Sequence, residues 1–212
     1  MNNVFTRIAE LKLVPVVKIE QAKDALALGE ALLAGGLPLA EVTFRTEAAE
    51  GSIRILSARL PEMLVGAGTV LAVEHVKRAV DAGAQFIVAP GFNPKVVDYC
   101  LSNGILIVPG VNSPTDVEMG LDRGLNVLKF FPAEASGGLG MLKALSGPYS
   151  GVKYMPTGGI APDNLLEYLA FDRVLACGGT WMVETDLISA GRFDEITQRT
   201  CEAVKLIAGF RN

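Results

Sequence analysis

The sequence is poor in residues that several classes of protein require. It contains one histidine, His75, and three cysteines, and the cysteines (Cys100, Cys177 and Cys201) show no CxxC spacing. This odd, unspaced set indicates neither a disulfide framework nor a zinc site, so we expect reduced thiols. Because His75 lies in a predicted helix beside Glu74, a chemistry that requires histidine is disfavoured. No carboxylate or histidine cluster has metal-ligand spacing, and we expect no metal and no cofactor.

Positive charge and long hydrophobic segments are lacking as well. The formal net charge is −4, and no basic stripe follows the chain, which argues against a nucleic-acid partner. Gly, Pro, Asn and Ser interrupt each apolar run before it reaches membrane-spanning length. Residues 1–13 carry Arg7, Glu10 and Lys12 among apolar residues, a pattern typical of a short amphipathic helix and not of a signal peptide. We therefore expect a cytoplasmic protein with no membrane or nucleic-acid partner.

What the chain has instead is a regular series of short apolar runs. They start roughly 20 to 25 residues apart, the length of one strand plus one helix, and helix-period stretches lie between them. Eight such units in one block of composition predict an α/β protein with a single domain, residues 1–212. We expect a closed (β/α)8 TIM barrel whose additional N-terminal helix covers the bottom. A doubly wound open sheet is the alternative, although such sheets usually stop at about five to seven strands. The predicted strands are residues 14–19, 39–44, 64–68, 86–90, 105–109, 127–131, 152–156 and 174–177, and the predicted helices include 22–33, 73–80, 94–101, 113–124 and one that starts at 162.

Lys129 places a charge where a buried strand should have none. Residues 127–132, VLKFFP, form an apolar run between glycines, which is typical of a parallel strand covered on both faces. Burial disfavours an ammonium group, and a neutral buried lysine can attack a carbonyl carbon and form a Schiff base. The structural alternative is a lysine whose head reaches water or a structural carboxylate. Lys18, at another strand end, is the rival nucleophile, but the neighbouring Glu20 favours a solvated or ion-paired role.

The predicted strand 39–44 supplies polar partners for this lysine. Period-two alternation places Glu41, Thr43 and Arg45 on one face, so Glu41 and Thr43 point into the barrel and Arg45 lies at its mouth. A purely structural Glu41–Lys129 ion pair is the alternative, because inward charges are costly unless they pair or do chemistry. The convergence of further residues at the same end favours an active site. These residues are Thr69, Pro90 and Thr157.

Paired glycines end two consecutive predicted strands. Glycine lets the backbone approach a ligand closely, and N–H groups at a helix N-terminus can bind phosphate. The loops after the seventh and eighth strands are also the usual phosphate position in a TIM barrel. We therefore predict a phosphate site formed by Gly158, Gly159, Gly178, Gly179 and Thr180.

Two long segments resemble the bacterial 2-keto-3-deoxy-6-phosphogluconate (KDPG) aldolase / 4-hydroxy-2-oxoglutarate (KHG) aldolase family. They are residues 36–45, GLPLAEVTFR, and 124–137, GLNVLKFFPAEASG. Shorter matches at 66–70 (GAGTV), 89–91 (APG), 108–110 (VPG) and 156–160 (PTGGI) extend the similarity through nearly the whole chain. One position departs from the family pattern, which has Gly-Gly-Ser-Trp where this chain has Thr180. Threonine keeps the hydroxyl and adds a methyl group, which bears on phosphate affinity and substrate preference and not on the chemistry.

The resemblance implies a class I aldolase that reversibly cleaves KDPG to pyruvate and D-glyceraldehyde 3-phosphate, or KHG to pyruvate and glyoxylate. Lys129 would form the Schiff base and Glu41 would shuttle protons. A homotrimer and a place in the Entner–Doudoroff pathway are implied as well. Three alternatives stay open: an aldolase for the galactose-series epimer, a phosphosugar isomerase or epimerase, and a non-catalytic phosphometabolite-binding barrel. The residues implied to line the substrate pocket are Arg45, Thr69, Pro90, Phe131 and Thr157.

Overall fold

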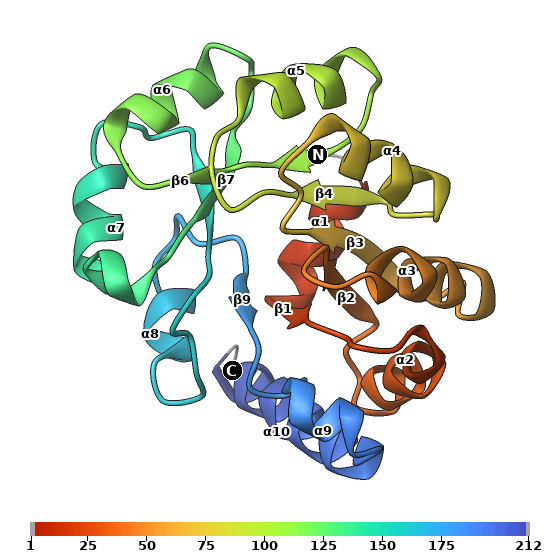
Figure 1. Cartoon of the computed structure of the whole chain (residues 1–212). Helices are drawn as coiled ribbons and strands as arrows, with labels where there is room; N and C mark the ends of the chain where they lie inside the picture. The colour runs from red at the N-terminus through yellow and green to blue at the C-terminus, as the bar shows by residue number, and fades with distance from the viewer. Residues whose placement is uncertain (1–2, 211–212) are drawn as a thin grey trace.

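Parallel strands and helices alternate along the chain in the computed structural model, which describes residues 3–210 (Figure 1). Each predicted strand overlaps an observed one. The strands are β1 (Leu13–Val17), β2 (Leu39–Thr43), β3 (Leu64–Gly68), β4 (Phe86–Val88), β5 (Ile107–Val108), β6 (Gly110–Val111), β7 (Val127–Phe130), β8 (Lys153–Pro156) and β9 (Cys177–Gly179). The helices are α1 (Asn3–Leu11), α2 (Ala25–Ala34), α3 (Ala48–Arg59), α4 (Val73–Asp81), α5 (Pro94–Ser102), α6 (Pro114–Leu121), α7 (Gly138–Ser146), α8 (Leu165–Leu169), α9 (Thr185–Ser189) and α10 (Phe193–Phe210), with short 3-10 turns at η1 (Ala22–Asp24) and η2 (Glu134–Ser136).

The strands pair in parallel to form a curled sheet with helices on its outer side (Figure 1). Six strands follow the order β5-β4-β3-β2-β1-β9, and β6-β7-β8 form a second group. Isolated parallel bridges, Tyr154↔Val174 and Thr157↔Gly178, connect β8 with the segment that contains β9. The coarse prediction of one α/β unit with parallel strands is therefore confirmed. Among the helices within residues 3–210, none is long and apolar enough to cross a bilayer.

Two predicted elements differ in detail from the observed ones. The run at 105–109 divides at Pro109, because proline has no N–H to donate to a strand ladder. Before this residue β5 pairs with β4, and after it β6 pairs with β7. The helix expected to start at 162 begins at Leu165, where Asn164 accepts a bond from the Ala161 N–H and so holds a turn ahead of it.

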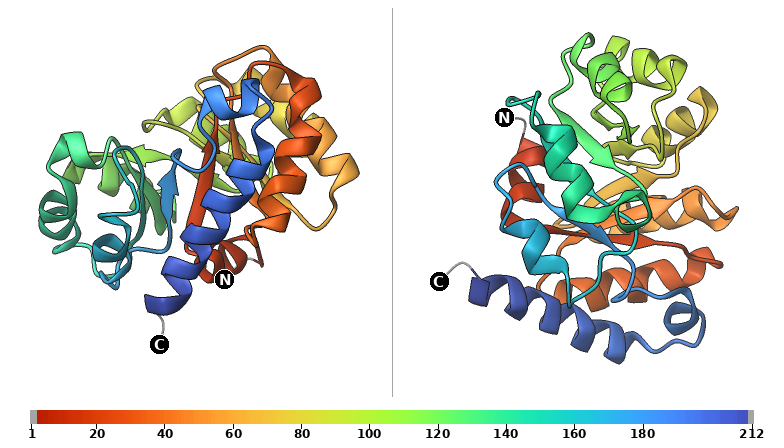
Figure 2. Two further views of the ribbon diagram at one scale, coloured as in Figure 1. Left: turned by 90° about the horizontal axis from the view of Figure 1, so that it is seen from below. Right: turned by 90° about the vertical axis from the view of Figure 1, so that its left-hand side faces the viewer.

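Alternation along the strands separates two apolar cores. Leu128 and Phe130 belong to the core between the strands and the helices, whereas Val127 belongs to a second core inside the curled sheet. Ile8 of α1 is fully buried in this inner core. The N-terminal helix therefore covers the interior at the end of the strands opposite to the polar residues, and Met1 and Asn2 lie outside the described residues. Figure 2 shows α10 running beside α2, where the Thr197 hydroxyl donates to the Ala31 carbonyl.

Candidate active site

One cavity of about 250 Å³ brings together every site residue predicted from the sequence. It opens among the carboxyl ends of the strands, and we call it the inner pocket. The predicted residues that line it are Glu41, Arg45, Thr69, Pro90, Lys129, Phe131, Thr157, Gly158, Gly159, Gly178, Gly179 and Thr180. Val16, Thr43 and Ile160 line it too. The alternation used for β2 would have found Val16 in β1, whereas Ile160 lies in a loop and carries no such signal.

Lys129 and Glu41 meet inside this pocket from opposite parts of the sheet. Their side chains are 6% and 1% exposed, and Lys129 Nζ lies 3.4 Å from Glu41 Oε1. A strong charge-assisted hydrogen bond spans about 2.7–2.9 Å, so this contact is a loose one. The structural ion pair considered from the sequence does exist. Because it faces a cavity of ligand size, both groups are accessible to a bound molecule.

Phe131 forms an apolar wall beside the lysine. The Lys129 Nζ atom lies 5.2 Å from the centroid of the Phe131 ring, a distance typical of a cation–π contact. The rival nucleophile has different surroundings, because Lys18 forms an ion pair of 2.6 Å with Glu20 and its side chain is 37% exposed. The ion-paired role predicted for Lys18 is thereby confirmed.

Thr43 fixes the orientation of Arg45. The buried Thr43 hydroxyl donates to the Val17 carbonyl at 2.7 Å and accepts from Arg45 Nε at 3.2 Å. The Arg45 Nε–H therefore already donates a hydrogen bond within the protein. Within the described structure, the two terminal amino groups of the guanidinium remain free to bind a ligand at the mouth of the inner pocket. A fork held in this way is suited to a carboxylate or phosphate.

Thr69 carries backbone strain at the pocket wall. Its φ angle is +54°, in the left-handed region that β-branched residues avoid. Such a conformation costs about 1–3 kcal/mol and persists where the surroundings enforce it, commonly at functional sites. Here it lets the chain leave β3 while Thr69 lines the inner pocket. No sequence pattern indicated this strain.

The loop after β8 has the conformation that a glycine pair permits. Gly158 and Gly159 both have positive φ angles, +100° and +80°. The segment after β7 holds this loop in place, because the N–H groups of Ala133 and Glu134 donate to the carbonyls of Thr157 and Gly158.

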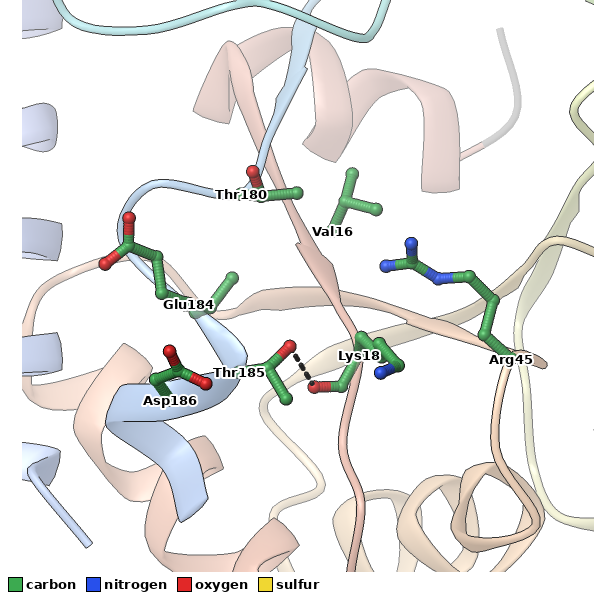
Figure 3. Close-up of a pocket in the computed structure, with 8 residues that line it drawn as sticks. Val16, Lys18, Arg45, Thr180, Glu184, Thr185 and Asp186 are labelled. Atoms are coloured by element: carbon green, nitrogen blue, oxygen red, sulfur yellow. Dashed lines mark hydrogen bonds between the residues drawn. The ribbon is translucent and has the colours of Figure 1, made fainter. Parts of the chain in front are cut away.

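A second cavity, of about 460 Å³, adjoins the inner pocket (Figure 3). We call it the outer pocket; the two share Val16, Arg45 and Thr180. Its wall carries charges of both signs, and the Thr185 hydroxyl donates to the Lys18 carbonyl. Sequence reasoning missed this region, because residues 183–186 follow no strand pattern. Its other lining residues are Lys18, Val183, Glu184, Thr185 and Asp186.

Cys177 is the first residue of β9, directly before Gly178 and Gly179 in the sequence, and it is fully buried. Burial raises the pKa of its thiol, so the thiol stays protonated at neutral pH. The thiolate, which is the reactive form of cysteine, is therefore disfavoured here. Cys177 is therefore a small residue of the apolar core.

Comparison with known proteins gives consistent results over nearly the whole chain. A model of the KDPG and KHG aldolase family matches residues 4–199. The 2-dehydro-3-deoxy-phosphogluconate aldolase of Treponema pallidum (strain Nichols) is 46% identical over 207 residues, which are 98% of this chain and 99% of that protein.

Solved structures agree with the sequence comparison. KDPG aldolase from Legionella pneumophila, with pyruvate captured at low pH as a covalent carbinolamine intermediate, has a TM-score of 0.90 and 39% identity, covering 96% of this chain and 98% of that one. The 2-keto-3-deoxy-6-phosphogluconate aldolase of Zymomonas mobilis ZM4 with 3-phosphoglycerate has a TM-score of 0.88 and 37% identity, covering 96% of each chain.

The packing around Glu41 yields a prediction for Gly68→Ala. A Cβ atom on Gly68 would lie 2.2 Å from Glu41 Oε1. Because the nearest atoms belong to the end of a side chain, we expect the carboxylate to move away from Lys129, at a cost of about 1–3 kcal/mol in the free energy of unfolding. A crystal structure and chemical denaturation of the variant measure both effects. Gly91→Ala is the control, since no atom lies within 4 Å of its added Cβ. An undisplaced Glu41 in Gly68→Ala would contradict the prediction.

Proposed function

The chain belongs to the KDPG and KHG aldolase family, and we propose that Lys129 and Glu41 perform its chemistry. It is a class I aldolase, a carbon–carbon lyase that reversibly cleaves KDPG to pyruvate and D-glyceraldehyde 3-phosphate. The observation that supports these two residues is their buried 3.4 Å contact inside a ligand-sized cavity. A lysine and a carboxylate in contact supply a nucleophile and a proton carrier in one place.

Formation of the Schiff base uses both groups. The neutral amine of Lys129 attacks the C2 ketone of the substrate and gives a carbinolamine. Glu41, acting directly or through a water, protonates the departing hydroxyl, and the imine forms.

Cleavage follows from the same arrangement. The protonated imine withdraws electrons while Glu41 removes the proton from the C4 hydroxyl. The C3–C4 bond then breaks, the aldehyde leaves, and the enamine is protonated before hydrolysis releases pyruvate. Arg45, held by Thr43, binds the substrate carboxylate, while Thr69, Pro90 and Thr157 line the pocket around the keto acid.

The phosphate of the substrate binds at the loops after β8 and β9. These loops carry the paired glycines Gly158–Gly159 and Gly178–Gly179, and they line the inner pocket together with Thr180. Thr180 also borders the outer pocket, so this residue lies where the far end of a long substrate would pass. The Zymomonas mobilis relative with 3-phosphoglycerate supports a phosphorylated ligand in this family.

We also propose that the curled sheet is a closed (β/α)8 barrel and that residues 1–212 form one domain. Two features support closure. Residues 107–111 run from β5 into β6 with only Pro109 between them, and the bridges between residues 154–157 and 174–178 join the other edges. The last two residues, like the first two, lie outside the described part of the chain.

Treatment with pyruvate and borohydride tests the nucleophile. The reduced imine is a stable adduct, so we expect intact mass and peptide mapping to place one pyruvyl group on Lys129. Lys129→Ala should fold, form no adduct and lose turnover, whereas Lys18→Ala should still be modified. An adduct on Lys18 would leave the assignment as a class I aldolase unchanged, but it would show that Lys18 and not Lys129 is the nucleophile. No adduct in folded wild-type protein would favour an isomerase or epimerase.

Kinetics with phosphorylated and unphosphorylated substrates test the proposed contact between Thr180 and the substrate phosphate. In Thr180→Ala we expect the KM for KDPG to rise about tenfold to a hundredfold, the loss of one hydrogen bond to a charged group. The KM for unphosphorylated KHG should not change, and Thr180→Ser should behave like the wild type. Equal losses on both substrates would contradict a phosphate contact. Turnover of KDPG, its galactose-series epimer and KHG by the wild type then ranks the three substrates.

Family membership also supports a homotrimer that acts in the cytoplasm in the Entner–Doudoroff pathway. The chain has a mass of 22.4 kDa. Sedimentation equilibrium should therefore give a particle about three times as heavy. A mass that stays at one chain across the concentration range would contradict the trimer.

A further inference from the structure

A single arginine on α10 holds the segment that leaves β9. Arg199 Nη1 donates to the Trp181 carbonyl at 2.9 Å and to Glu184 Oε2 at 2.8 Å. Its Nη2 donates to Glu195 on the same helix at 2.6 Å. One guanidinium therefore connects α10 to two points of the loop formed by residues 179–184, which we call the β9 loop. Figure 1 shows α10 beside this loop, outside the strands.

The side chain of Trp181 fixes the start of the β9 loop. A Cβ atom on Gly179 would lie 1.9 Å from the indole ring, so the ring packs directly on the backbone of that glycine. Thr180 is thus placed between a residue covered by the indole and a residue whose carbonyl is bound by Arg199. Within the loop, the Val183 N–H donates to the Thr180 carbonyl at 2.9 Å and closes a turn.

Arg199 also neutralises the negative charge of Glu184. Glu184 lines the outer pocket together with Thr180 and Arg45, and Figure 3 shows its carboxylate directed away from Arg45. Arg199 pairs with this carboxylate from the α10 side. Without the arginine, the Glu184 carboxylate would lose this positively charged partner, and a negative charge beside the outer pocket would repel a phosphorylated substrate.

We propose that Arg199 is a positioning residue for recognition of the phosphorylated end of the substrate, acting through Trp181 and Glu184 on Thr180. Arg199 is not among the residues that line the inner or the outer pocket, so it acts without touching the substrate. The inference rests on the proposed phosphate role of the β9 loop. It assigns to α10 a part in substrate selection that is separate from the chemistry at Lys129.

Arg199→Gln tests the proposal, with Arg192→Gln as the matched control. Arg192 also pairs with Glu195 but contacts neither Trp181 nor Glu184 in the described structure, and it is 59% exposed. We expect the KM for KDPG to rise about tenfold in Arg199→Gln, with little change in kcat, because this variant can no longer hold the loop that orients a binding group. The KM for KHG and the rate of pyruvate–borohydride trapping should match the wild type. Arg192→Gln should change none of these values.

Trp181 is the single tryptophan of the chain, so its fluorescence reports the β9 loop independently of activity. Quenching by acrylamide should increase in Arg199→Gln and stay constant in Arg192→Gln. If Arg199→Gln does not fold, Arg199→Lys takes its place: it keeps the charge but cannot donate to both loop partners in the same fork geometry. For Arg199→Lys we then expect smaller increases in the KM for KDPG and in acrylamide quenching of Trp181.

Equal losses on KDPG and KHG, or unchanged quenching and an unchanged KM for KDPG, would overturn the positioning role. Failure of the proposed function gives a different result. Wild-type protein that forms no pyruvate adduct would refute the aldolase site, whereas a shift of Trp181 quenching in Arg199→Gln would still be measured.

Discussion

The contact between Lys129 and Glu41 is the constraint on which the rest of the site depends. The two residues lie on β7 and β2, which are not neighbours in the sheet, and they meet because the sheet curls around a shared interior. Two charges removed from water are stable only when each finds a partner. Gly68 leaves the space that the Glu41 carboxylate occupies, since a Cβ there would overlap it. The curl of the sheet and the absence of one side chain therefore produce the pair together.

The interior is divided along the strands into an apolar end and a polar end. Val127 lies two residues before Lys129 on the same face of β7, yet it belongs to the inner core that Ile8 of α1 covers. Met155, the partner of Lys129 in the register of β8, is buried in that core as well. The lysine thus rests on close-packed apolar side chains that give it little freedom. This packing holds Lys129 in place while the opposite end of the interior opens into the inner pocket.

Local pattern was sufficient to predict the strands and most of the inner pocket, and the family resemblance added Phe131, but neither indicated the parts that depend on long-range contacts. Alternation placed Glu41 inside because period two is a property of the strand itself. The break at Pro109 could be suspected from the missing N–H, but not the exchange of partners from β4 to β7 that accompanies it. The positive φ of Thr69 has no sequence signal, since the neighbouring structure imposes it. Arg199 lies 18 residues beyond the carbonyl that it binds, and no motif connects the two.

With the roles proposed for Lys129, Glu41 and Thr180, these contacts separate chemistry from selection. The base of the inner pocket is built from strand residues, whose positions the ladder bonds and two cores fix, and a change there alters the reaction itself. The rim is built from the β9 loop, whose position depends on Trp181, Glu184 and a helix outside the strands. Under the proposed phosphate role of the β9 loop, replacements on the rim or on α10 shift the preference between phosphorylated and unphosphorylated keto acids while Lys129 and Glu41 remain in place. Thr180, the position where this chain departs from the family pattern, lies on the rim and not at the base.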